Sequence, residues 1–96
     1  MLEVNKILQL KEEYILHKLD IGNGKFWLFN IENGDVYKLN RISYTILSLI
    51  DGKSTVGEIN RCLFDKYPNK KPDLILKDFE ELIERIRREN IINERR

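Results

Sequence analysis

The spacing of apolar residues changes once along this chain, at Leu39, and that change limits the folds available to it. Before Leu39, short segments rich in apolar residues are separated by polar turns, at residues 13–19, 25–31 and 35–39. Short β-rich segments bounded by turns are typical of strands. After Leu39 the apolar residues recur every three or four positions, which is typical of amphipathic helices. Strands followed by helices indicate an α+β fold, a small sheet with a group of helices.

The three predicted strands are joined by short turns, which favours an antiparallel meander. Gly22-Asn23-Gly24 separates the first strand from the second, and Glu32-Asn33-Gly34 separates the second from the third. Glycine and asparagine tolerate the positive φ angles that tight turns require. Residues 1–12 fit neither period cleanly, so they are predicted as a strand or an irregular lead-in.

Three helices are predicted after the strands, at about residues 41–50, 55–67 and 73–90. Asn40 can cap the first helix by accepting backbone N–H groups, and Gly52 can supply its left-handed C-terminal cap. Thr55-Val56-Gly57-Glu58 has the pattern of a capping box at the start of the second helix. Pro72 suits the first turn of the third helix. The buried stripe of that helix is predicted to be Ile75, Phe79, Leu82, Ile83 and Ile86.

The size and charge of the chain exclude several classes of protein. Its 96 residues, 42% of them hydrophobic and 34% charged, predict a single folded domain over residues 1–96. A net charge of +1 gives no electrostatic case for phosphate binding. No apolar run reaches the ~20 residues of a membrane span, and residues 1–10 do not resemble a signal peptide. With Cys62 as the single cysteine, we expect a cytoplasmic protein.

The residue types that carry chemistry are not grouped along the sequence. His17 is the single histidine and lies in a predicted strand, while Cys62 lies beside the apolar stripe of the second helix. A metal site needs several such ligands at a set spacing, and no serine stands in a nucleophile-elbow motif. The sequence therefore predicts a protein that is not an enzyme and that holds no metal or cofactor.

The third helix mixes acidic and basic side chains on its exposed face. Glu81 and Arg85 are four residues apart, the spacing of a helical ion pair, as are Glu84 and Arg88. Three helices with a small sheet also suggest a winged helix, a fold that often binds DNA. A recognition helix presents basic residues to phosphates, whereas this helix is mixed in charge. DNA binding is therefore the alternative function.

The order of these segments from residue 36 to residue 92 resembles the PqqD family. The matching features are YKLN leading into a helix, then ILSLIDGKSTVGEI, then DFEELIERIRRENII after a variable loop, with the hairpin FWLFNIENGDVYKLN in front. One departure is Asn90, which stands where a glycine is common, although asparagine also tolerates a left-handed cap. The family comprises the small protein of pyrroloquinoline-quinone biosynthesis and related recognition elements for ribosomally made, modified peptides.

The resemblance implies a winged-helix-like domain that binds the leader segment of a precursor peptide and presents it to a modifying enzyme. That enzyme is often a radical S-adenosylmethionine enzyme, and otherwise a cyclase or a protease. The leader would add as a strand to the third strand of the sheet and lie in a groove beside the third helix. The candidate peptide-binding residues of the strand are Asp35, Val36, Tyr37, Lys38 and Leu39.

Two faces of that strand and one row of the third helix define the expected groove. Because side chains alternate along a strand, we expect Tyr37 and Leu39 to face the helices, and Val36 and Lys38 to lie on the other face. The row on the helix, whose members are three or four residues apart, is Leu74, Asp78, Glu81, Arg85 and Arg88.

An open strand edge also allows two copies of the chain to pair, so a homodimer is a further possibility.

Overall fold

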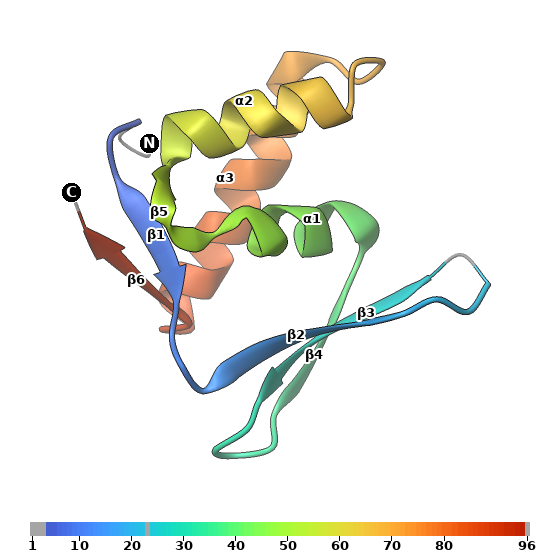
Figure 1. The fold of residues 1–96 in the computed structure, drawn as a ribbon, viewed down its shortest axis with the longest axis vertical. Helices are drawn as coiled ribbons and strands as arrows, with labels where there is room; N and C mark the ends of the chain where they lie inside the picture. Colours follow the sequence, from blue (N-terminus) through green and yellow to red (C-terminus); the bar gives the residue numbers. More distant parts are fainter. Residues whose placement is uncertain (1–3, 23, 96) are drawn as a thin grey trace.

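The computed structural model describes residues 4–22 and 24–95, so Asn23 of the predicted first turn lies outside the described residues. Within these two ranges, nine elements follow one another in the order β1 (Ile7–Leu10), β2 (Tyr14–Leu19), β3 (Lys25–Asn30), β4 (Val36–Leu39), α1 (Arg41–Leu49), β5 (Asp51–Thr55), α2 (Val56–Lys66), α3 (Pro72–Arg88) and β6 (Ile92–Arg95) (Figure 1). The predicted α+β class, with a sheet followed by three helices, is confirmed.

The predicted meander is the sheet of β2, β3 and β4, in that order. Its strands are antiparallel, with Leu16 opposite Leu28 and Leu28 opposite Tyr37. One face of the sheet packs on the helices, because Phe26, Leu28 and Leu39 are buried in the common core. β4 pairs with β3 on one side and is an edge strand on the other.

A second sheet, in the order β5-β1-β6, was not predicted as a sheet. Residues 7–10 of the lead-in form its central strand, with Ile7 opposite both Thr55 and Arg95. The link between the first two helices is therefore a strand and not a simple cap. Gly52 has the expected left-handed backbone, with φ of 78°, but α1 already ends at Leu49. Pairing of Asp51 and Thr55 with β1 makes residues 51–55 an irregular strand with a register shift, and this long-range contact overrides the local cap signal.

The helices otherwise begin and end close to the predicted residues. Thr55 and Glu58 form the predicted capping box at the start of α2. All five residues of the predicted α3 stripe are buried. After α3, Asn90 has φ of 61°, its N–H donates to the carbonyl of Arg87, and the N–H of Ile91 donates to the carbonyl of Ile86. These two bonds make a Schellman motif, the left-handed ending that Asn90 was predicted to tolerate.

Figure 1 shows β1, β5 and β6 near the two ends of the chain, while β2, β3 and β4 extend away from them below α1. The helices contact one another, and α1 also contacts β2 and β3. Within the described residues, none of the helices combines the length and the apolar character that crossing a membrane requires.

Candidate functional site

Among the strands of the described residues, β4 has a neighbour on one side only, so its other edge presents unpaired main-chain groups. At the turn before β4, the N–H of Asn30 donates to the carbonyl of Asp35 at 2.8 Å. Hydrogen-bonded and non-bonded pairs alternate along an antiparallel ladder, so Tyr37 and Leu39 direct their main-chain groups toward β3. The N–H and C=O groups of Val36 and Lys38 therefore point outward, along the open edge.

The turn that positions β4 is organised by a buried polar side chain. Asn30 is 7% exposed, and its Oδ1 accepts the N–H groups of Glu32 at 2.9 Å and Asn33 at 3.2 Å. Asn33 in turn accepts the N–H of Asp35 at 2.9 Å, and Gly34 has φ of 80°. These bonds fix the register in which β4 returns along β3.

The side chains of β4 alternate as predicted. Leu39 is buried and Tyr37 is half-buried on the side of the helices, while Val36 is 55% exposed and Lys38 is exposed on the other face. Tyr37 also contacts Tyr14, with ring centroids 6.4 Å apart. One face of β4 is thus part of the core, and the edge beside it is open.

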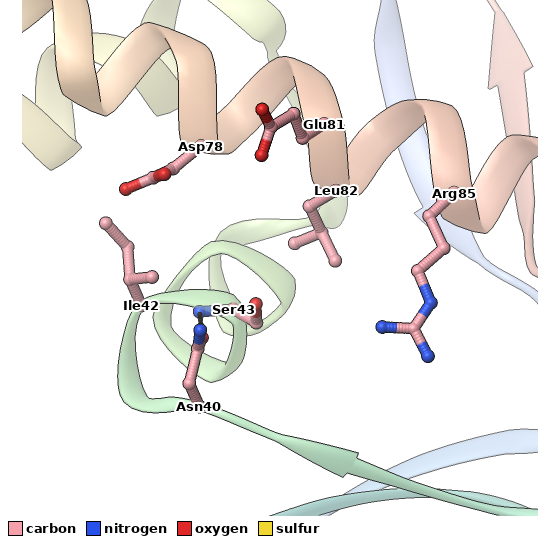
Figure 2. A pocket seen from close by; sticks show the side chains of 7 residues that line it. All are labelled: Asn40, Ile42, Ser43, Asp78, Glu81, Leu82 and Arg85. Atoms are coloured by element: carbon pink, nitrogen blue, oxygen red, sulfur yellow. Dashed lines mark hydrogen bonds between the residues drawn. The ribbon is translucent and has the colours of Figure 1, made fainter.

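A groove runs between β4 and α3 and consists of two adjoining hollows. The first is a shallow depression of only about 10 Å³, is mainly apolar and is lined by Leu28, Tyr37, Leu39, Leu47, Leu82, Arg85, Ile86, Glu89 and Ile91. The second, of about 230 Å³, is more polar and is lined by Asn40, Ile42, Ser43, Asp78, Glu81, Leu82 and Arg85 (Figure 2). Because Leu82 and Arg85 line both hollows, the two form one groove with an apolar end and a polar end.

The polar end lies where β4 passes into α1. Asn40 caps α1 by accepting the N–H of Ser43 at 2.8 Å. Figure 2 shows Asp78 and Glu81 on α3 across from these two residues, with Arg85 further along the same helix. Acidic side chains therefore lie on one wall of the groove and the first turn of α1 lies on the other.

The charges on α3 are unequally neutralised. Lys70, from the loop before α3, bonds Asp78 at 2.7 Å. Arg85 lies 3.8 Å from Glu89, so the predicted pairing of Arg85 with Glu81 is wrong. Glu89 is the C-terminal cap residue of α3, one helical turn after Arg85, and both residues line the apolar end of the groove. Within residues 4–22 and 24–95, Glu81 makes no ion pair.

Tyr37 supplies a hydroxyl group at the apolar end, beside the charged side chains of Arg85 and Glu89. Partial burial raises the pKa of its phenol above the ordinary value, and Tyr14 and the carboxylates of Glu89 and Asp35 raise it further. The phenol therefore stays protonated at neutral pH and can donate a hydrogen bond.

The predicted site residues fall into three groups in the structure. Tyr37, Leu39, Asp78, Glu81 and Arg85 line the groove. Asp35, Val36 and Lys38 lie on the open strand or in its turn, outside the groove. Leu74, 48% exposed, lines a separate hollow with residues 66–71, and the exposed Arg88 lines neither part of the groove.

The groove also contains residues that were not predicted as part of the site. Its polar and charged members among these are Asn40, Ser43 and Glu89, and its apolar members are Leu28, Ile42, Leu47, Leu82, Ile86 and Ile91. Two signals were available for them. Asn40 was predicted as a helix cap directly after the edge strand, which places the first turn of the helix beside that edge. Glu89 follows Arg85 by one helical turn.

The residues considered for chemistry lie apart from one another. His17 is on the outer face of the sheet, stacked on Trp27 with ring centroids 6.0 Å apart. Cys62 is exposed on α2. Over the described ranges, no three His, Cys, Asp or Glu side chains are grouped in a way that could hold a metal ion.

Comparison with known proteins gives two findings. The family model for "Coenzyme PQQ synthesis protein D (PqqD)" matches residues 26–92, which is more than half of the chain. A solved structure described as "TbiB1 in Complex with the TbiA(beta) Leader Peptide" has a similar fold, with a TM-score of 0.71 and 13% sequence identity. The similarity covers 88% of this chain and 94% of that chain. A search of curated protein sequences finds no match.

Proposed function

This chain belongs to the PqqD family, and on that premise we propose that it binds an extended peptide, the leader segment of a ribosomally made precursor peptide, without catalysing a reaction itself. The observation that carries the proposal is the open edge of β4 beside a groove on the same side of the sheet. The structurally similar TbiB1, which was solved with a leader peptide, supports it.

The geometry of β4 determines how a peptide strand would lie. Val36 and Lys38 each offer an outward N–H and C=O, so an added strand would exchange hydrogen bonds with these two residues. The peptide residues opposite Tyr37 and Leu39 would then direct their side chains into the groove, since side chains alternate. The residues opposite Val36 and Lys38 would lie on the exposed face of the sheet.

The two kinds of contact contribute differently to binding. Each main-chain hydrogen bond adds only about 0.5–1.5 kcal/mol net and does not depend on the peptide sequence. Apolar side chains that lie over the shallow apolar end, beside Tyr37 and Leu39, would add about 25 cal/mol per Å² of apolar surface removed from water. The strand edge therefore supplies general affinity, and the groove supplies selectivity.

We also propose that the bound peptide is presented to a separate biosynthetic enzyme. The described residues hold no metal-binding group, and the groove residues are polar, apolar and charged side chains suited to binding. Candidate partners are a radical S-adenosylmethionine enzyme, a cyclase or a protease. We expect the pair to act on soluble peptide in the cytoplasm.

The test of peptide binding uses two matched proline variants on the two open edges of one sheet. Lys38→Pro removes an outward N–H on β4, so binding of a fluorescein-labelled leader peptide should weaken by at least about fivefold in fluorescence anisotropy. Lys18→Pro makes the same change on β2. Because the carbonyl of Glu13 accepts from Ile31 at 2.8 Å, alternation points the N–H of Lys18 away from β3 as well.

Lys18→Pro should bind the peptide as tightly as the unchanged protein does. An equal loss in both variants, or no saturable binding of any candidate leader, would reject binding at β4. Circular dichroism spectra of both variants check that the sheet and helices persist.

Two other uses of this surface are separable by experiment. DNA binding is not favoured, because Asp78, Glu81 and Glu89 line the groove and α3 is mixed in charge. DNA binding would show an affinity that falls steeply with added salt.

Pairing of two copies through β4 would compete with the peptide. Light scattering with and without peptide would then show a molecular mass that falls on peptide addition.

A further inference from the structure

We propose that Glu81 selects for a lysine or arginine in the bound peptide. This basic residue lies two positions before the first of two apolar residues, and one residue of any type separates those two. This inference rests on the proposed function, because it assigns the chemistry of the peptide that enters the same groove. The expected peptide pattern is therefore basic–x–apolar–x–apolar, read from the N-terminus.

The order of basic and apolar residues in the peptide follows from the positions of the polar and apolar ends of the groove along β4. Its apolar end lies by Tyr37 and Leu39, and its polar end lies by Asn40 and Ser43, so the two ends succeed one another along the chain direction of β4. Groove-facing residues of an added strand recur every second position, about 6.6–6.8 Å apart. Two of them face Tyr37 and Leu39, and the next lies beyond Leu39, over the polar end.

The direction of the peptide follows from the preference for antiparallel pairing, which is slightly more stable per residue than parallel pairing. In an antiparallel strand, the residue facing Tyr37 comes after the residue facing Leu39. The residue over the polar end comes before both. The basic residue therefore precedes the apolar pair.

The charge that this first residue meets is negative. Asp78 is already bonded to Lys70 at 2.7 Å, and Arg85 lies 3.8 Å from Glu89. Glu81 is a carboxylate of the polar end that has no ion-pair partner within the described ranges. Figure 2 shows Glu81 beside Asp78 on the α3 wall that faces Asn40 and Ser43.

A basic peptide side chain at this position would supply the missing partner. The bound peptide covers part of the groove from water, which strengthens an ion pair relative to one on an open surface. An acidic side chain would instead meet the carboxylate of Glu81, which has no cation of its own in the described ranges. We expect a lysine-to-glutamate change in the peptide to weaken binding by about three- to tenfold at low salt.

The experiment selects peptides from an mRNA-displayed library of random 12-residue sequences. Three immobilised proteins are used: the unchanged chain, Glu81→Lys and Glu80→Lys. Glu80 is exposed and does not line the groove, so Glu80→Lys gives the same change of net charge at a neighbouring position of α3. Synthetic peptides that differ in one lysine or glutamate then give the affinity ratio by anisotropy.

The unchanged chain and Glu80→Lys should enrich basic–x–apolar–x–apolar, and Glu81→Lys should enrich an acidic residue at the first position. Enrichment of the apolar pair with no basic preference, or a basic preference that Glu81→Lys leaves intact, would overturn the role of Glu81 and leave peptide binding standing. Failure of all three proteins to enrich any peptide would overturn peptide binding itself.

Discussion

The two sheets of this protein are alike in strand number but differ in how they are assembled. β2, β3 and β4 follow one another along the chain and are joined by short turns. In the other sheet, β1 lies between β5, from the middle of the chain, and β6, from its end. The sheet of consecutive strands leaves the edge of β4 open beside the groove. The sheet of distant strands ties the two ends of the chain to the helices.

Ion pairs and hydrogen bonds reinforce the sheet of distant strands. Glu94 of β6 accepts two bonds from Arg87, at 2.6 and 2.8 Å, and one from Lys6 at 3.2 Å. Arg95 donates to the carbonyl of Gly52 at 2.7 Å, across to β5. In the sheet of β2, β3 and β4, the pair of Lys18 and Asp20 lies at an exposed end. Both sheets contribute buried residues to the core, but long-range polar contacts reinforce one of them, while the other leaves an edge strand open for the proposed peptide.

The largest expected effect is at the centre of the sheet of distant strands. Leu8 of β1 is 0% exposed and belongs to the core, so Leu8→Ala should lower the free energy of unfolding by about 2–5 kcal/mol in a urea titration. Ile15 of β2 is 49% exposed on the outer face, and Ile15→Ala should change that free energy by less than about 0.5 kcal/mol. Equal losses would show that burial in the core does not decide how much a strand residue contributes to stability.

A smaller effect is expected at the turn that positions β4. Asn30→Ala removes the acceptor of two N–H groups and should cost about 1–2 kcal/mol of unfolding free energy. Because the register of β4 then loosens, peptide affinity should fall as well. Asn30→Asp keeps an acceptor oxygen and serves as the control for both measurements. If peptide affinity were unchanged in Asn30→Ala, the turn would not determine the binding edge.

The contrast between the sheets also explains which parts of the fold were predictable. The strands within residues 13–39 carry their own signals, since β-rich segments and turn residues are adjacent in sequence. The segments DGKST and INER, at residues 51–55 and 92–95, are mostly polar and short. They are strands because β1 lies between them, and no local pattern reports a partner so far along the chain.

The site was also predictable only in part, because local patterns orient side chains but do not show how distant elements pack together. Alternation along β4 was enough to orient Tyr37 and Leu39. Spacing along α3 identified one row of side chains, but not which part of the row faces β4. That depends on the packing of α3 against α1 and the sheet, which places Asp78, Glu81 and Arg85 at the groove and Leu74 beyond it. Lys70, which donates to Asp78, lies in the loop before α3, and no local sequence pattern predicts that bond.

A pH-dependent effect is expected in the sheet of distant strands. The hydrogen bonds from Arg87 hold the pKa of Glu94 below its ordinary value of 4.5, with help from Lys6. A depressed pKa means that the carboxylate stabilises the fold above pH 4.5, and that this contribution is lost as the pH falls through the lower, folded-state pKa. Glu94→Gln should therefore cost about 1 kcal/mol at pH 7, after allowance for the solvent around Arg87.

The measurement is the difference in unfolding free energy between the unchanged chain and Glu94→Gln from pH 7 down to pH 3. The difference should shrink below pH 4.5 as the carboxylate takes up a proton. Glu12→Gln, at an exposed carboxylate, is the control. A difference that stayed constant with pH would mean that β6 is held by packing alone.

The smallest expected effect lies where α3 passes into β6. Asn90 has φ of 61°, a conformation that costs an alanine more than an asparagine and costs a glycine least. Asn90→Ala should lower the unfolding free energy by about 0.5–1 kcal/mol, and Asn90→Gly should leave it within a few tenths of a kcal/mol. Peptide affinity should not change in either variant, because Asn90 does not line the groove. A loss of affinity in Asn90→Ala alone would show that the ending of α3 also positions Glu89 and Arg85, and that the two sheets are coupled through this helix.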